Sequence, residues 1–270
     1  MIDEMPEKKK KKKLLSEMTR VEVKEALARG VDTAVLPMGS VEQHGPHGPL
    51  GVDYFCAMVV AEKVSQKLDA VLLPSPVYGA SSNHMHFPGT ISLSPETVVG
   101  LVDDICRSAS YHGFKKLIII NGHEGNDSML NIAARRVREE TGLAVTVSNW
   151  FGALMEIWKT LPGISGTKLE TLEWHDIMSH GGILEIALTM AYKPEIVRMD
   201  LAVTAPSKKR QLMSNAVLRF PAWMEEVAEE GSYGDPRGAT AELGERWAEI
   251  ASQRIVEKTK LLWEAIKAKP

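Results

Sequence analysis

The sequence alternates between short runs of apolar residues and longer stretches in which apolar residues recur at helical spacing. Short apolar runs between turn signals are typical of buried strands, whereas the longer spacing is typical of helices with one buried face. The apolar runs predict strands at 33–37, 71–73, 116–120 and 144–148. The clearest run reads KLIII, which is typical of a parallel strand covered on both faces.

Capping signals mark the ends of the predicted helices. Thr19 and Glu22 form a capping-box pattern, and Ser94 before Pro95 supplies a cap followed by a proline in the first turn. The predicted helices cover 19–30, 53–68, 94–112, 126–141, 182–192 and 240–268. Residues 195–239 fit no single element. Strands and helices that alternate in this way predict one α/β domain, with three α/β/α layers and a mostly parallel sheet.

Composition and charge narrow the class of protein. The chain of 270 residues is 44% hydrophobic, and its longest apolar stretches are interrupted within about ten residues, well short of the roughly 20 that a membrane helix needs. Residues 1–13 hold six lysines against three acidic residues, a charge of +3, which leaves −6 on the rest because the whole chain carries −3. An acidic body argues against a nucleic-acid partner. We expect a disordered lysine-rich tail at 1–13, one domain at 14–270, and a cytoplasmic protein without a membrane segment.

Candidate metal ligands follow two of the predicted strands. Glu42 and His44 lie in the loop GSVEQHGPH after the first strand, and Asp53 begins the next helix. The KLIII strand is followed by NGHEGN, which holds His123 and Glu124 between glycines. Because the loops at the carboxyl ends of parallel strands meet at one edge of the sheet, we expect these side chains to lie close together.

The types of ligand predict a site for one or two divalent ions. A centre of two ions needs a carboxylate that bridges ions about 3.5–4 Å apart, and Asp53 suits this place because its short side chain starts a helix. Glu42 and His123 would then bind one ion. His44 would bind the other, which stays open to water and substrate. Imidazole and carboxylate ligands without thiolates favour zinc first, with manganese or iron(II) as alternatives.

A further loop, SHGGILE, brings candidates for acid–base chemistry. It places His180 before two glycines and Glu185 in the first turn of a helix. With Glu124, these are the candidate catalytic residues. Each also has an ordinary structural explanation: a carboxylate such as Glu185 favours the amino end of a helix, and a single loop histidine is commonly a surface or capping residue.

Polar residues around the FPGT turn predict contacts to the substrate. Asn83, His84 and His86 precede that turn. A structured loop held by its own polar groups is an equally good explanation for them. The candidate substrate-binding residues are Asn83, His86 and Ser179.

Five segments together resemble the creatininase, or creatinine amidohydrolase, family. They are LPMGSVEQHGPHGPLGVD at 36–53, HFPGT at 86–90, NGHEGN at 121–126, HGGILE at 180–185 and GDPRGAT at 234–240. The resemblance implies an α/β/α hydrolase of a small molecule, with a binuclear metal centre and a homo-oligomeric, often hexameric, assembly. The ligands that it implies are Glu42, His44, Asp53 and His123. It also implies that Asp53 bridges the ions and that His180 carries a proton beside the substrate.

The chain departs from the pattern of true creatininases, as the resemblance describes them, in two places. Those proteins have a metal-binding glutamate two residues after the histidine of NGH, where this chain has Gly125. They have tryptophan and glutamate just before the histidine of HGG, where this chain has Asp176 and Ser179. The resemblance therefore implies a non-creatininase member. Such members act on other cyclic or formyl amides, on peptide-derived cofactors, or on cyclic diketones.

The sequence thus predicts a metal-dependent hydrolase in which a water activated by two ions opens a small cyclic amide or related carbonyl compound. Two alternatives stay open. One is a C–C bond hydrolase that opens a cyclic polyol diketone of the inosose type. The other is a metal-containing binding protein without turnover. The missing carboxylate at Gly125 supports this last alternative, and an open coordination position argues against it.

Overall fold

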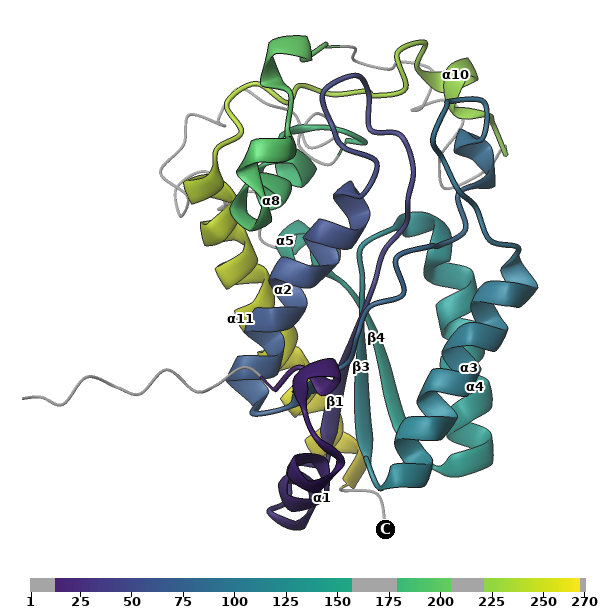
Figure 1. The fold of residues 1–270 in the computed structure, drawn as a ribbon, viewed down its shortest axis with the longest axis vertical. Coiled ribbons are helices and arrows are strands. Elements are labelled where there is room, and N and C mark those ends of the chain that lie inside the picture. Colours follow the sequence, from purple (N-terminus) through teal and green to yellow (C-terminus); the bar gives the residue numbers. More distant parts are fainter. Residues whose placement is uncertain (1–12, 157–178, 205–220, 268–270) are drawn as a thin grey trace, which may run out of the picture.

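The computed structural model describes residues 13–156, 179–204 and 221–267, which form three layers (Figure 1). The middle layer is a parallel sheet with the strand order β2–β1–β3–β4. Its strands are β1 (Thr33–Met38), β2 (Val71–Leu72), β3 (Lys116–Asn121) and β4 (Ala144–Asn149). The four predicted strands are confirmed, and so is the α/β/α class.

Helices cover both faces of the sheet, as Figure 1 shows. On one face lie α2 (Val52–Leu68), α5 (Trp150–Met155), α8 (Ile183–Tyr192) and α11 (Ala241–Lys267). On the other face lie α3 (Pro95–His112) and α4 (Asp127–Thr141). Side chains that alternate along β3 enter two separate cores. Ile118 and Ile120 pack with α2 and α8, whereas Leu117 and Ile119 pack with α3 and α4.

The predicted caps are present at two helices. Ahead of α1 (Arg20–Ala28), Thr19 Oγ1 accepts a hydrogen bond from Glu22 N, and Thr19 N donates to the Glu22 carboxylate. Ahead of α3, Ser94 Oγ accepts from Thr97 N at 3.2 Å. Both caps satisfy amide groups that a helix leaves unpaired in its first turn.

Other parts of the chain add to the predicted pattern. The pattern did not predict α5, and α4 begins one residue later than expected because the 3-10 turn Glu124–Asn126 precedes it. The unassigned region 195–239 contains short helical turns in its described part, among them α10 (Met224–Val227). Of the predicted tail, only Lys13 is described, and its Nζ lies 2.7 Å from Asp69 Oδ1. No described helix is long and apolar enough to cross a membrane.

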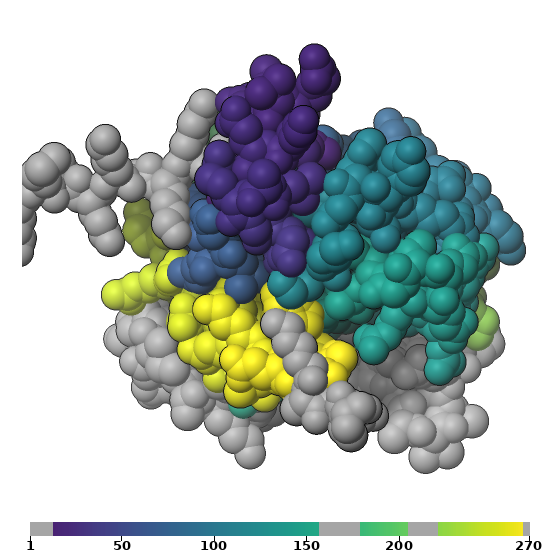
Figure 2. Space-filling view, turned by 90° about the horizontal axis from the view of Figure 1, so that it is seen from below, coloured from purple at the N-terminus to yellow at the C-terminus, as the bar shows by residue number. Residues whose placement is uncertain are grey.

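The carboxyl ends of β1 and β3 carry the loops with the predicted ligands. These loops lie at the end of the molecule away from α1 (Figure 1). Figure 2 shows the other end, where α1 and the last turns of α11 lie. The first turn of α2 approaches the end of β3 so closely that a Cβ on Gly122 would lie 2.1 Å from the Asp53 carbonyl oxygen. Glycine at this position therefore lets Asp53 reach the same edge as His123.

Candidate metal centre

Four buried side chains from three segments meet at the carboxyl edge of the sheet. Glu42 and His44 come from the loop after β1, Asp53 from the first turn of α2, and His123 from the loop after β3. None of the four is more than 7% exposed. The structure thus brings together the side chains that the sequence predicts as ligands.

Asp53 directs its two carboxylate oxygens toward two different histidines. Its Oδ1 lies 3.3 Å from His44 Nε2, and its Oδ2 lies 3.1 Å from His123 Nδ1. Glu42 completes the group, with Oε2 3.3 Å from His123 Nε2. Glu42, Asp53 and His123 each offer one ligand atom within 4.8 Å of the other two. A carboxylate placed in this way is suited to bridge two cations.

Backbone carbonyl groups determine which ring nitrogen of each histidine faces Asp53. His44 Nδ1 donates to the Glu42 carbonyl oxygen at 3.1 Å, and His123 Nε2 donates to the Ala80 carbonyl oxygen at 2.9 Å. Metal-binding histidines commonly donate their other ring N–H to such an acceptor. His44 Nε2 and His123 Nδ1 are therefore the nitrogens available to a cation.

Several buried polar atoms of this group have no hydrogen-bond partner among the described residues. They are Glu42 Oε1 and Oε2, His44 Nε2 and Asp53 Oδ2. Buried polar atoms are nearly always paired, and an unpaired buried charge is costly. Divalent cations between these atoms would satisfy all of them, so the residues present fit the metal centre that the sequence predicts.

The protonation states of the four side chains depend on one another. Burial raises the pKa of Glu42 to about 7. Burial alone would lower the pKa values of the two histidines, but the neighbouring carboxylates raise that of His44 to about 9 and that of His123 to about 10. Burial would raise the pKa of Asp53, yet the two histidines hold it well below its usual range. Without a cation, protons on the imidazoles balance the carboxylate charge.

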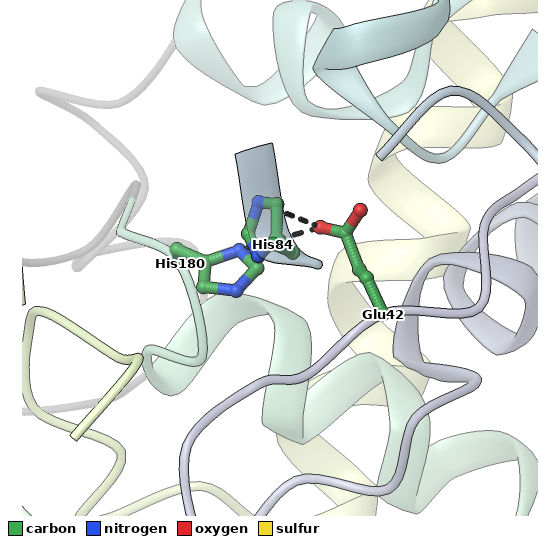
Figure 3. Close-up of side chains that lie close together, drawn as sticks. All are labelled: Glu42, His84 and His180. Carbon is green, nitrogen blue, oxygen red and sulfur yellow. Dashed lines mark ion pairs between the residues drawn. The ribbon is translucent and has the colours of Figure 1, made fainter. Parts of the chain in front are cut away.

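Two more histidines lie beside Glu42, as Figure 3 shows. His84 Nε2 is 3.5 Å and His180 Nδ1 is 3.8 Å from Glu42 Oε1. Burial, together with the nearby histidines, lowers the pKa of His84 to about 3 and that of His180 well below its usual value. Both rings are therefore neutral near pH 7.

The side chain of Gln43 determines the tautomer of His84. Gln43 Oε1 accepts a hydrogen bond from Gly45 N at 3.0 Å, which sets the orientation of the amide group. Its Nε2 then donates to the Gly231 carbonyl oxygen at 2.8 Å and to His84 Nδ1 at 2.9 Å. His84 therefore keeps its proton on Nε2, the nitrogen that faces Glu42, and presents a donor N–H on that side.

His180 has the opposite arrangement. Its Nε2 donates to the Gln43 carbonyl oxygen at 2.7 Å, which leaves Nδ1 as an acceptor on the side of Glu42. The ring also stacks on His44, with ring centroids 4.1 Å apart. A neutral imidazole with a free acceptor nitrogen beside the ligand group is able to take up and return a proton.

Glu185 reaches the same group from the first turn of α8. Its Oε2 accepts a hydrogen bond from Gly181 N at 2.7 Å and lies 3.6 Å from His44 Nε2. Burial raises the pKa of Glu185 to about 7. His44, His180 and Glu185 each offer one ligand atom within 4.8 Å of the other two. Glu185 therefore contributes a carboxylate on the His44 side of the centre.

The remaining predicted site residues are less central. Glu124 is exposed and belongs to none of the groups of ligand atoms found among the described residues. Asn83 is partly buried, and Ser179 is buried where the loop enters α8. Asp176 lies outside the described residues.

His86 is exposed and belongs to a separate contact. Its ring stacks on Trp223, with centroids 4.3 Å apart, and it hydrogen-bonds to Glu225. This contact joins the loop before the FPGT turn to α10 and the residue ahead of it. His86 therefore links two loops rather than joining the ligand group.

The sequence does not indicate the roles that Gln43 and His84 have in this site. Gln43 carries no charge and matches no catalytic pattern, but its place between Glu42 and His44 is a signal that it shares their loop. The sequence marks His84 only as part of a pocket loop, and the structure places it against Glu42. Neither role can be predicted from spacing, because both depend on hydrogen bonds between distant segments.

Carboxylates and imidazoles gathered at the carboxyl edge of a parallel α/β sheet are the arrangement of a metal-dependent hydrolase. The profile of the family described as creatinine amidohydrolase matches residues 16–259. The chain therefore belongs to the creatininase family, and it is a metal-dependent hydrolase.

Three characterised relatives show how the family varies in substrate. The creatinine amidohydrolase of Pseudomonas putida is 29% identical over 90% of this chain and 94% of its own length. The mycofactocin precursor peptide peptidase of Mycobacterium tuberculosis is 31% identical over 78% of each chain. The 3-dehydro-scyllo-inosose hydrolase of Thermotoga maritima is 27% identical over 71% of this chain and 60% of its own.

Solved structures share the whole fold. A mutant creatininase of the "Zn-Zn type" matches with a TM-score of 0.78 and 26% identity, covering 93% of this chain and 98% of its own. A structure described as "Creatininase Mn" matches with the same TM-score and coverage at 28% identity. The similarity therefore extends over nearly the full length of both chains.

Proposed function

We propose that this metal-dependent hydrolase opens a small cyclic amide or related carbonyl compound at a centre of two divalent ions. The observation that carries the proposal is the placement of Asp53, whose two oxygens face two different histidines at 3.3 and 3.1 Å. A side chain that served one ion, or only a hydrogen bond, would not need to present both oxygens in this way.

The residues divide into two ligand groups. Glu42, His123 and Asp53 Oδ2 would hold one ion, and His44 and Asp53 Oδ1 would hold the other. Zinc is our first choice, and manganese or iron is the alternative. Two neighbouring structures are described with zinc and with manganese, which supports both metals as candidates. Such ions, when bound, polarise a carbonyl group and lower the pKa of water.

The histidines beside Glu42 supply the proton chemistry. His180 presents Nδ1 as an acceptor, because its Nε2 is bound to the Gln43 carbonyl group. We assign to it the transfer of a proton from water to the leaving nitrogen or carbon. His84, in contrast, presents a donor N–H at Nε2. It is suited to donate a hydrogen bond to a substrate oxygen on which negative charge develops.

Turnover with a panel of lactams, formyl amides and short peptides, measured on protein loaded with zinc or manganese, tests this assignment. We expect hydrolysis of at least one class and its loss in the His180→Ala variant. A His180→Ala protein that binds the same compounds and differs in no rate would instead support a metal-containing binding protein.

A second candidate is a C–C bond hydrolase that opens a cyclic polyol diketone. The similarity to the inosose hydrolase of Thermotoga maritima supports it. The same centre would serve, with His180 returning the proton to carbon rather than nitrogen. Product analysis by mass spectrometry with an amide panel and a cyclic diketone separates the two.

Four further assignments are part of the proposal and rest on the sequence. Asn83, His86 and Ser179 are proposed as substrate contacts, and Glu124 as an auxiliary acid or base near the centre. Assembly into a homo-oligomer, a hexamer by family resemblance, is testable by light scattering on the purified protein. A cytoplasmic location is testable by fractionation of cells.

A further inference from the structure

We infer that Glu185 is the third protein ligand of the second ion, the one bound by His44 and Asp53. This inference rests on the proposed two-ion centre and adds one residue to it. The carboxylate comes from the first turn of α8, a helix separated from the loop of His44 and from Asp53 by more than a hundred residues of sequence.

The two halves of the centre differ in their number of ligands. Glu42, Asp53 and His123 give one half three protein ligands. The other half has only His44 Nε2 and Asp53 Oδ1 from the predicted set. Catalytic zinc sites have three protein ligands and one open position. The second half therefore lacks one protein ligand.

Glu185 lies where that ligand is needed. Its Oε2 is 3.6 Å from His44 Nε2, and Asp53 Oδ1 is 3.3 Å from the same nitrogen. Two ligands of a tetrahedral ion with bonds of about 2.0–2.2 Å lie about 3.3–3.6 Å apart. Both distances match this spacing. His44 Nε2 itself is fully buried and has no hydrogen-bond partner among the described residues, so it points to a cation between these atoms.

The loop around Glu185 presents its carboxylate toward His44. Gly181 takes a left-handed conformation, with φ of 68°, and its N–H donates to Glu185 Oε2 at 2.7 Å. An oxygen with one N–H partner still has a lone pair free for a cation. A carboxylate that served only the amino end of α8 would not need to face a buried imidazole.

Position 125, where the family resemblance implies a ligand, is closed to a side chain in this structure. A Cβ on Gly125 would lie 2.3 Å from His123 Nε2 and 2.6 Å from the Ala80 carbonyl oxygen. The adjacent Glu124 is exposed and joins no ligand group among the described residues. Glu185 thus places a carboxylate at the centre from a different element.

Metal content of the full-length Glu185→Gln protein tests the inference. Glutamine keeps an acceptor for Gly181 N–H but is a poor ligand. After reconstitution with zinc and removal of free metal, we expect two ions per chain in the wild type and one in the variant. Calorimetric titration should show a loss of affinity of about 100-fold or more at the weaker site, beyond the loss expected from a residue that only supports a ligand. Glu124→Gln, the matched control, should keep two ions.

A second variant and a spectroscopic signal distinguish the loss of a metal ligand from a folding defect. Glu185→Asp keeps the charge but withdraws the carboxylate by one methylene, so its affinity for the second ion should fall between those of wild type and Glu185→Gln. In Co²⁺-loaded protein the absorption of the second ion should change in both variants. Two ions held with wild-type affinity in Glu185→Gln would overturn the inference. A wild type that binds fewer than two ions would instead overturn the proposed centre.

Discussion

His44 Nε2 lies 3.3 Å from Asp53 Oδ1, and each group comes from a different segment of the chain. The other ring nitrogen, His44 Nδ1, donates to the Glu42 carbonyl group, so Nε2 is the nitrogen that faces the carboxylate. In the metal-free protein this nitrogen carries a proton beside Asp53, and a bound cation takes the place of that proton.

Metal binding should release protons and weaken as the pH falls. In the chain alone, neighbouring carboxylates raise the pKa values of His44 and His123 to about 9 and about 10, against the opposing effect of burial. Below those values each imidazole carries a proton that a cation must displace, so lower pH favours the metal-free form. Calorimetry in buffers of different ionisation enthalpy measures the release, which we expect at about one proton per imidazole near pH 7. Affinity that does not change between pH 6 and 8 would contradict this picture.

Replacing His180 by alanine should reduce the rate without removing metal. Its Nδ1 is 3.8 Å from Glu42 Oε1, and its place in the site is set by Gln43 rather than by a ligand contact to Asp53. We expect kcat to fall by about 10²–10⁴-fold, the usual contribution of a proton carrier. Metal content by mass spectrometry should stay at the wild-type value. A variant that loses its metal together with its activity would show that His180 is a ligand.

Replacing Gln43 by leucine should destabilise the protein. The change leaves the Gly231 carbonyl oxygen, His84 Nδ1 and Gly45 N–H without the partners that the amide provides. Each unpaired buried group costs about 1–3 kcal/mol, so the free energy of unfolding in urea should fall by at least that much. The ligands themselves are unchanged. An unaltered urea midpoint would mean that the network contributes little to stability.

Replacing Gly122 by alanine should separate α2 from the end of β3. The added Cβ would lie 2.1 Å from the Asp53 carbonyl oxygen, so the first turn of α2 has to shift. We expect a loss of about 1–3 kcal/mol in the free energy of unfolding, together with weaker metal binding.

Gly100→Ala is the matched control for this change. Gly100 lies within α3, and a Cβ there meets nothing within 4 Å. Alanine should stabilise this helix by about 0.5–1 kcal/mol and leave metal binding unaltered. Equal effects at the two glycines would contradict the close approach of α2 to β3.

Much of the fold can be predicted from local sequence signals. The run KLIII predicts β3 because only a strand covered on both faces is apolar at every position, and the structure buries residues 117–120 completely. The Thr19 and Ser94 caps are likewise local, since each side chain bonds to an amide three residues ahead. The ends of β1 and β3 then bring the ligand loops to one edge.

The features that the sequence does not predict depend on contacts between distant segments. The role of Gln43 arises from bonds to Gly231 and to His84, and no periodic pattern encodes such pairs. The position of Glu185 depends on how α8 packs against α2. A sequence shows that position 125 is glycine, but only the structure shows that the Ala80 carbonyl group fills the space beside it.

The most direct test of the two-ion centre is the metal content of the wild type and of Asp53→Ala, measured by inductively coupled plasma mass spectrometry after purification without chelator. Asp53 faces both histidines, so its removal should affect both halves of the site. We predict two ions per chain in the wild type and none in the variant. A single ion in the wild type, or one ion retained in Asp53→Ala, would contradict a centre bridged by this carboxylate.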